Sequence, residues 1–263
     1  MSSWFFFIAL LIITIIFLLL PIIYLFYSST LGQFSNLSLS FSSLVLESIA
    51  LTIITSFLSS LVSILLALPS AYFLSRVNFF GKKIIEGALD LPSSIPHPII
   101  GIAILLIFSE VGPLGSISNL LGFQVLYSIQ GIIIAQTLIS MPISIRALIN
   151  TFKSMDLSPE ISALTLGVPI SKIFLRVVLP RIRNNIFSSF LITFARATSE
   201  FGSIAIVAYY VSQPPFNGIN PAPVLIWNLF EIYGLKYSLP ASFSLLLISF
   251  AISSLIKIIE GKD

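Results

Sequence analysis

The sequence of 263 residues contains no cysteine and only one histidine, His97. The lack of cysteine excludes disulfides, thiolate metal ligands and a cysteine nucleophile, and one histidine excludes a polyhistidine metal site. No Gly-x-x-x-x-Gly-Lys-Ser/Thr loop is present, because Gly81-Lys82-Lys83 lacks both the first glycine and the hydroxyl residue. No paired-carboxylate active site is visible either. The chain is therefore predicted to be non-catalytic and unable to hydrolyse ATP alone.

Charge is also scarce, since 9% of the residues are charged while 57% are hydrophobic. A soluble domain is about half apolar and about a quarter charged, so this chain cannot cover a globule with polar side chains. Most of its surface is therefore predicted to face a lipid bilayer. The net charge of +3 is too small to indicate a nucleic-acid partner.

Apolar segments long enough to span a membrane recur along the chain, each needing roughly 20 residues. The first lacks a basic region before it and an Ala-x-Ala site after it, so we interpret it as a retained helix rather than a signal peptide. The third carries Pro92, Pro96 and Pro98, which should break or kink it. These features predict an all-α polytopic membrane protein with about six spanning helices, approximately 4–27, 43–75, 84–109, 128–152, 184–211 and 238–259.

Lysine and arginine are sorted onto alternate connections. The loops 28–42, 110–127 and 212–237 contain a single basic residue, Lys236. The other connections and the C-terminal end carry the remaining loop charges, among them Arg76, Lys82, Lys83, Arg146, Lys153, Lys172, Arg176, Arg181, Arg183, Lys257 and Lys262. Because basic loops stay in the cytoplasm, both termini are predicted to be cytoplasmic in a multi-pass protein of the cell membrane.

The longest polar interruption on the predicted cytoplasmic side is 153–183. Ser158-Pro159-Glu160 is typical of a helix start, with Ser158 as the N-cap, proline at the first helical position and an acidic first turn. Gly167 is a plausible end, because glycine tolerates the left-handed conformation. A second short helix is expected from Ser171 to Val178. Two short helices beneath the membrane would form a docking platform.

Arg196 and Glu200 lie four positions apart within the fifth apolar segment, so they should share one helix face. Ionisable groups at membrane depth are costly and are often functional. The pair could shape or gate a polar path, or it could be a neutralised structural pair between helices, and the sequence leaves both interpretations open. The same segment contains the hydroxyl residues Thr193, Thr198, Ser199 and Ser203, which are also common in buried helix interfaces.

Asp90 and His97 lie in the third apolar segment, on either side of its first proline. Together they could form a proton relay. The favoured interpretation is that they hydrogen-bond backbone groups freed by the prolines. Outside the apolar segments, Asn36-Leu37-Ser38 forms a glycosylation sequon in a predicted outer loop, but such triplets often arise by chance.

The 153–183 loop resembles the cytoplasmic motif of permeases from binding-protein-dependent ABC importers. That motif reads Glu-Ala-Ala, three residues, Gly, nine residues, Ile-x-Leu-Pro. The second alanine, the glycine and the final Leu-Pro are matched here by Ala163, Gly167, Leu179 and Pro180. The departures are Ile161 for the glutamate, Ser162 for the first alanine and Val177 for the isoleucine, with Glu160 one position earlier.

The resemblance is closer to one subgroup. Residues 194–202, Phe-Ala-Arg-Ala-Thr-Ser-Glu-Phe-Gly, are similar to the fifth-helix signature of molybdate, tungstate and sulfate permeases. Residues 95–101, Ile-Pro-His-Pro-Ile-Ile-Gly, resemble their third-helix segment, and Gly112-Pro113-Leu114-Gly115 is also similar. The similarity extends over nearly the whole chain from about residue 40. It looks most like the archaeal-type tungstate/molybdate permease at 208–210, 222–226 and 233–235.

This resemblance implies a type I ABC importer permease fold. Residues 1–39 would form the first spanning helix and an outer loop, and 40–260 the ABC transporter transmembrane type-1 domain. Two permease copies would pair around a central path, above two ATP-binding subunits that bind the ATP and Mg²⁺. An extracytoplasmic binding protein would deliver the oxyanion. The chain itself would carry no cofactor.

The resemblance also assigns residues. Coupling to the ATPase would involve Glu160, Ser162, Ala163, Leu164, Gly167, Leu179 and Pro180. The translocation path or gate would involve Arg196, Thr198, Ser199, Glu200 and Gly202. Molybdate or tungstate is the favoured cargo, and sulfate or thiosulfate is the nearest alternative. A stand-alone secondary transporter is a third hypothesis, disfavoured because no internal duplication is visible.

Overall fold

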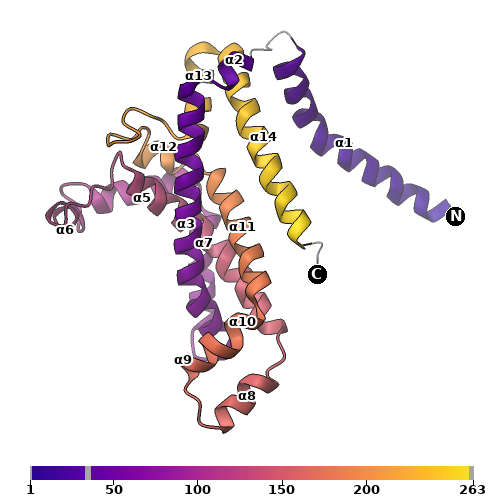
Figure 1. Ribbon diagram of the computed structural model, residues 1–263, viewed down its shortest axis with the longest axis vertical. Helices are drawn as coiled ribbons and strands as arrows, with labels where there is room; N and C mark the ends of the chain where they lie inside the picture. Colours follow the sequence, from indigo (N-terminus) through magenta and orange to yellow (C-terminus); the bar gives the residue numbers. More distant parts are fainter. Residues whose placement is uncertain (1, 33–36, 261–263) are drawn as a thin grey trace.

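The computed structural model describes residues 2–32 and 37–260, so Asn36 of the sequon and Lys262 lie outside the described residues. Every regular element within these ranges is helical. Figure 1 shows an elongated bundle with one end built from short helices and a first helix that leans away from the rest. The predicted all-α polytopic fold is confirmed.

Three helices form the centre of the bundle: α3 (Ser43–Arg76), α7 (Ile129–Ser154) and α11 (Arg183–Thr198), which pack against one another. The buried face of α3 includes, beside apolar residues, a stripe of small hydroxyl residues: Ser48, Thr52, Thr55, Ser56, Ser59, Ser60 and Ser63. Small side chains let apolar helices approach closely, and most of these hydroxyls are satisfied by the backbone of their own helix. This part of the contact between the central helices is therefore close and is built from uncharged side chains.

Length and composition identify three single helices in the described residues that can cross a membrane: α1 (Ser2–Thr30) over Trp4–Thr30, α3 and α7. They correspond to the first, second and fourth predicted segments. The sixth corresponds to α14 (Leu235–Glu260), which includes the apolar stretch Leu235–Ala251. The remaining two predicted segments are helical but broken.

The third segment divides into α4 (Lys82–Ser94) and α5 (His97–Phe108), which are bent by 101°. The break lies at Ile95, whose backbone is extended because a residue before proline disfavours the helical region. The predicted interruption by proline is thus confirmed, and it is a sharp turn rather than a gentle kink.

The fifth segment was expected as one helix over 184–211, and this is wrong. Helix α11 ends at Thr198, a turn follows, and α12 (Ile204–Val207) is a single helical turn. The carboxylate of Glu200 accepts a hydrogen bond from the backbone N–H of Ser203 (3.0 Å), which replaces a helical backbone bond. A polar side chain that bonds the main chain favours a turn over a continuous helix.

Each of the three predicted outer loops contains a short helix in its described part: α2 (Leu37–Ser40), α6 (Gly115–Leu120) and α13 (Ala222–Tyr233). The prediction of a turn-rich connection over 212–237 holds only for its first part. Pro221 and Pro223 mark the start of α13, where proline needs no N–H partner. The glycine that ends α13, Gly234, has a positive φ.

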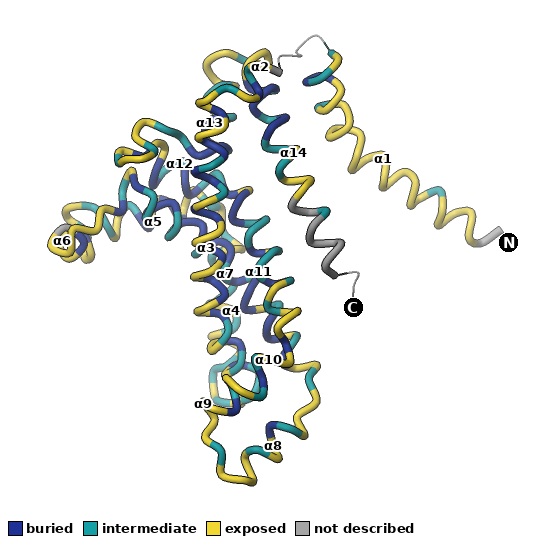
Figure 2. The backbone as a smooth tube through the Cα atoms, in the orientation of Figure 1, coloured by how far each residue is buried: buried dark blue, intermediate teal, exposed yellow. Residues whose placement is uncertain are grey.

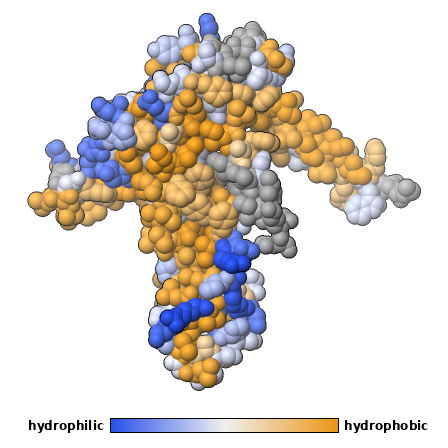
Figure 3. Space-filling model, in the orientation of Figure 1, coloured by the Kyte–Doolittle hydropathy of each residue, from blue (hydrophilic) through white to orange (hydrophobic). Residues whose placement is uncertain are grey.

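Helix α1 is exposed along almost its whole length, and no residue of its most apolar stretch is buried (Figure 2). It contacts α14 near its last turns, where Phe26 and Phe243 bring their ring centroids to 5.4 Å. In Figure 3 hydrophobic residues cover the middle of the visible face and hydrophilic residues gather at the lower end, over α8 to α10. This surface fits lipid around the middle and water at the end.

Candidate functional sites at the platform and within the bundle

The platform is the set of short helices at the lower end of Figure 1. Its first helix, α8 (Ser158–Thr165), begins one residue earlier than expected. Ser158 is not the N-cap, because the carboxylate of Asp156 accepts hydrogen bonds from the Ser158 N–H (3.0 Å) and hydroxyl (2.8 Å). The hydrogen bond from the Ser158 backbone lowers the pKa of Asp156. Glu160 lies in the first turn, as predicted, and Asp156, two residues before the predicted N-cap, supplies a second carboxylate at the helix start.

The end of α8 is as predicted. Gly167 has φ +76°, and its N–H donates to the Leu164 carbonyl (2.9 Å). The next N–H, that of Val168, donates to the Ala163 carbonyl (3.1 Å). These two bonds form a Schellman motif, in which glycine supplies the left-handed residue. Val168 and Ala163 both pack against the apolar cluster between α3 and α7, so the end of the helix is fixed.

The second platform helix is longer than the predicted Ser171–Val178. It runs through α9 (Ile170–Ile173), the π-helical turn η1 (Phe174–Val178) and α10 (Leu179–Arg181). Leu179 and Pro180 therefore lie within the helical stretch and do not end it. The buried side chains of Ile173, Val178 and Ile182 join the apolar cluster at the ends of α3 and α7.

The outer face of α8 is apolar and uncovered. Ile161 and Leu164 are exposed on the helix, and Leu166 just beyond it is 83% exposed. Ser162 is also exposed, and its hydroxyl bonds the Ser158 carbonyl within the helix. Exposed apolar residues on a short, well-capped helix outside the apolar surface of the bundle are suited to a protein partner.

Glu160 does not share this outer face. It is 4% exposed, and its carboxylate accepts bonds from Arg76 Nη2 (2.6 Å), Arg76 Nε (3.0 Å) and the Tyr72 hydroxyl (3.0 Å). Burial alone would raise the pKa of Glu160, but the hydrogen bonds from Arg76 and Tyr72 outweigh it and lower the pKa. The sequence indicated Arg76 only as a loop charge, and nothing in its spacing points to Glu160.

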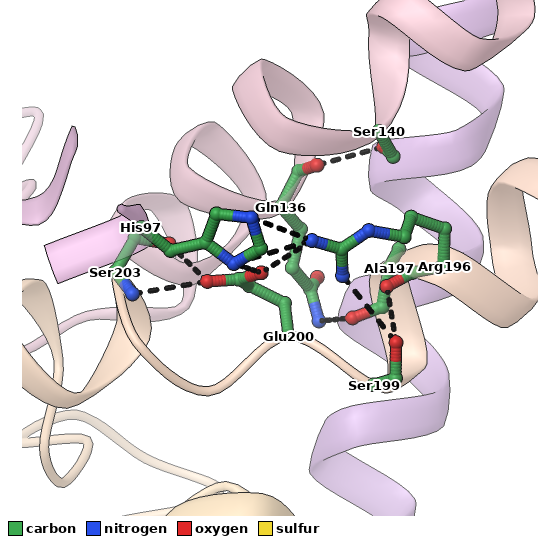
Figure 4. Close-up of polar contacts among 8 residues, drawn as sticks. All are labelled: His97, Gln136, Ser140, Arg196, Ala197, Ser199, Glu200 and Ser203. Atoms are coloured by element: carbon green, nitrogen blue, oxygen red, sulfur yellow. Dashed lines mark hydrogen bonds and ion pairs between the residues drawn. The ribbon is translucent and has the colours of Figure 1, made fainter. Parts of the chain in front are cut away.

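A second polar cluster lies within the bundle, at the turn between α11 and α12 (Figure 4). Arg196 and Glu200 form the predicted i,i+4 pair, with Arg196 Nη2 3.2 Å from Glu200 Oε2. The Glu200 side chain is completely buried, whereas that of Arg196 is 24% exposed. The pair therefore has one sheltered member and one that reaches the surface of this chain.

His97, the first residue of α5, completes this cluster. Its Nδ1 lies 2.9 Å from Glu200 Oε2, and its Nε2 lies 3.0 Å from Arg196 Nη2. A neutral ring with its proton on Nδ1 satisfies both contacts, donating to the carboxylate and accepting from the guanidinium. The proposed repair of the proline-broken backbone by His97 is therefore wrong.

The side chain of Asp90 does not repair the proline-broken backbone either. Its carboxylate pairs with Arg146 of α7, with Arg146 Nη2 2.5 Å from Asp90 Oδ2. Asp90 and His97 do not meet, so they form no relay. The Asp90–Arg146 pair ties the loosely packed α4 to α7 instead.

The turn itself is fixed by Glu200 and Gly202. The second carboxylate oxygen of Glu200 accepts both the N–H (3.0 Å) and the hydroxyl (2.8 Å) of Ser203. A side chain at Gly202 would place its Cβ 3.0 Å from His97 Cβ and 3.0 Å from Pro98 Cδ. Glycine thus lets the turn lie against the start of α5, which brings His97 to Glu200.

The hydroxyl residues proposed beside this pair have different surroundings. Thr198 is buried and bonds the Phe194 carbonyl (2.8 Å), whereas Ser199 is exposed and accepts a long bond from Arg196 Nη1 (3.4 Å). Gln136 of α7 was missed by the sequence analysis. Its amide donates to the Ala197 carbonyl (3.1 Å), so it links α7 to the end of α11.

Comparison with known proteins identifies the family. Residues 59–262 match the binding-protein-dependent transport system inner membrane component family. The chain belongs to this family. Its relatives are permease subunits, so it is a non-catalytic membrane component of an importer.

Individual relatives agree with this assignment. The chain is 32% identical over 248 residues to the molybdate/tungstate transport system permease protein WtpB of Methanocaldococcus jannaschii, covering 94% of this chain and 92% of the relative. It is 33% identical over 219 residues to the protein of the same name from Pyrococcus furiosus, covering 83% and 80%. A probable sulfate transport system permease protein, cysT of Chlorella vulgaris, is 32% identical over 207 residues, covering 76% of each chain.

The permease fold is shared with a solved structure. A chain in the crystal structure of a bacterial ABC transporter involved in import of the acidic polysaccharide alginate superposes with a TM-score of 0.71. The match covers 99% of this chain and 95% of the other at 17% sequence identity. It confirms the predicted ABC importer permease fold.

Proposed function

We propose that this permease translocates molybdate or tungstate, driven by ATP that separate subunits hydrolyse. The observation that carries the proposal is the identity of about one third to molybdate/tungstate permeases over most of both chains. Two copies would pair around a central path, with two ATP-binding subunits beneath them and an extracytoplasmic binding protein above. The basic loops support an orientation with the platform and both termini in the cytoplasm.

The platform supports coupling to the ATP-binding subunits. Its exposed apolar residues would enter a cleft of the partner, and the Schellman end at Gly167 would keep α8 rigid as it moves. The residues proposed for coupling lie on α8, at its C-terminal end or on α10: Glu160, Ser162, Ala163, Leu164, Gly167, Leu179 and Pro180. ATP would bias the assembly between two rigid-body states.

The cluster at the α11–α12 turn supports a role in the path or its gate. It combines a cation, Arg196, with a break in a spanning helix, and such breaks occur where protein or a polar cavity covers the backbone. The residues proposed for this role are Arg196, Thr198, Ser199, Glu200 and Gly202. A cation near the path would favour a dianion without binding it as tightly as the delivering protein does.

The test is uptake by proteoliposomes that contain this permease and its ATP-binding subunit, supplied with the binding protein. Radiolabelled tungstate or molybdate should accumulate only with ATP and with all three components. Uptake without ATP or without the ATP-binding subunit would favour a stand-alone secondary transporter, which the family assignment already opposes.

Sulfate or thiosulfate is the second candidate cargo, favoured by 32% identity to a probable sulfate permease. Calorimetric titration of the binding protein with tungstate, molybdate and sulfate separates the two. Tightest binding of sulfate would overturn the proposed cargo and leave the importer mechanism intact.

A further inference from the structure

One guanidinium at the end of α3 joins three elements. Arg76 donates to both carboxylate oxygens of Glu160 on α8, through Nη2 (2.6 Å) and Nε (3.0 Å). Its remaining nitrogen, Nη1, donates to the carbonyl of Phe152 near the end of α7 (2.8 Å). A planar guanidinium that binds a carboxylate bidentately fixes the angle between the two side chains as well as their distance.

Tyr72, one helical turn before Arg76, completes the arrangement. Its hydroxyl donates to Glu160 Oε2 (3.0 Å), and its ring lies 5.4 Å from that of Phe152 and 5.0 Å from that of Phe174. The ring is therefore held between α7 and η1 while its polar end reaches α8. We call Tyr72, Arg76 and Glu160 the clamp.

The clamp is the polar link between α8 and the long helix α3. The backbone of α8 packs against α9 and η1, whereas its connection to α3 runs through these side chains. The Glu160 side chain is 5% exposed and that of Arg76 is 18% exposed, so water screens the ion pair weakly. A buried pair of this kind is costly to separate, which favours joint movement of the two helices.

We infer that Arg76 and Tyr72 are positioning residues that transmit movement of α8 to α3. The Glu160 carboxylate faces α3 of its own chain and not the exposed face of α8. When a partner that binds the exposed face of α8 moves this helix, Arg76 transmits the movement to α3. Helix α3 then moves against α7 and α11 in the centre of the bundle. This inference rests on the proposed docking of ATP-binding subunits on α8.

The experiment compares Arg76→Met and Arg76→Lys with wild type in the reconstituted three-component transporter. Tungstate uptake per ATP hydrolysed should fall by about tenfold in Arg76→Met, because the carboxylate of Glu160 loses its buried partner. Arg76→Lys keeps the charge but not the bidentate geometry, so its ratio should be intermediate. ATP hydrolysis and binding of the ATP-binding subunit should persist in both. Arg183→Met is the matched control, since Arg183 is exposed at the same end and forms no ion pair within the described residues.

A second measurement reports on the clamp without transport. Because the chain has no cysteine, nitroxide labels can be placed at Ser70→Cys on α3 and Thr165→Cys on α8. Diluting the labelled permease with unlabelled wild type leaves one labelled copy in most assemblies, so electron-spin resonance reports the distance within that copy. In the assembled transporter the distribution of distances should be narrow in wild type and broad in Arg76→Met and Arg76→Lys. If Arg76→Met does not assemble with its partners, the uptake ratio and the distance distribution of Arg76→Lys test the clamp.

An unchanged uptake ratio together with an unchanged distance distribution in Arg76→Lys overturns the clamp. A wild-type ratio of anion uptake to ATP hydrolysis in Arg76→Met also overturns the clamp. Failure of wild type to take up the anion with ATP refutes the proposed function instead, while the label distances still test whether the clamp holds α8.

Discussion

Among the described residues, two Arg–Glu pairs with a buried carboxylate have nearly the same chemistry but differ in how far apart their partners lie in the sequence. At the platform, Arg76 and Glu160 are 84 positions apart and meet across three helices. At the α11–α12 turn, Arg196 in the last turn of α11 and Glu200 in the turn that follows are four positions apart. In both, the carboxylate is buried, the guanidinium is partly exposed, and a ring residue, Tyr72 or His97, contacts the carboxylate.

The difference lies in what each carboxylate holds together. Glu160 links separate helices, α8 and α3, and leaves the adjacent backbone as regular helix. Glu200 bonds the backbone of its own turn at Ser203 and so keeps α11 and α12 separate. The platform pair thus links two helices that we propose move together, whereas the second pair stabilises a local turn within the bundle.

The largest effect is expected at Glu200. Glu200→Ala leaves Arg196, His97 and the Ser203 N–H without their shared acceptor in an apolar bundle, at a cost of about 3–5 kcal/mol of unfolding free energy. Thermal unfolding in detergent should show a large drop in midpoint or a protein that does not accumulate. Glu110→Gln, an exposed carboxylate, is the control. A wild-type midpoint in Glu200→Ala would mean that the turn does not depend on the carboxylate.

At the platform, Gly167→Val should uncouple ATP hydrolysis from uptake. A β-branched residue at φ +76° costs about 1–2 kcal/mol and disfavours the Schellman end of α8. The ratio of anion transported to ATP hydrolysed measures the effect. Gly81→Val carries the same kind of strain at φ +84°, in open space outside the platform, and should remain coupled. Equal coupling in the two variants would contradict the importance of a rigid end.

Acid should loosen the platform pair. Because the pKa of Glu160 lies below its ordinary value of 4.5, the pair stabilises the folded platform fully above that pH. The contribution is lost as the pH falls through the folded pKa, so the protection factors of the α8 amides, which are corrected for the pH dependence of intrinsic exchange, should fall as the pH drops below about 4.5. Asp156 also has a lowered pKa, so the comparison uses Asp156→Asn with and without Glu160→Gln. An acid response that survives in the double variant would assign it to another group.

The smallest effect is expected at Ser203. Ser203→Ala removes one of the hydrogen bonds to Glu200 Oε1 but keeps the backbone bond, so it should cost about 1 kcal/mol. Chemical or thermal unfolding of the purified permease measures it. Ser199→Ala, whose exposed hydroxyl bonds its own helix, should be neutral. A Ser203→Ala cost as large as that of Glu200→Ala would place the control of the turn in the hydroxyl.

Much of this architecture was predictable from local pattern. Apolar runs gave the spanning segments, prolines gave the α4–α5 break, and Gly167 gave the end of α8, because each depends on a few neighbouring residues. The break after Thr198 was not predictable in the same way. It depends on which backbone groups the Glu200 carboxylate reaches, and the apolar pattern continues across it.

The sequence by itself determined a lipid-facing helical permease with a capped platform and an i,i+4 pair in its fifth segment, since hydropathy, charge sorting and helix spacing are local properties. Only the tertiary structure decided that Glu160 faces Arg76 and Tyr72, and that His97 joins Glu200 rather than Asp90. The packing of the helices determines which residues distant in the chain come into contact, and the spacing of residues along the sequence does not predict these contacts.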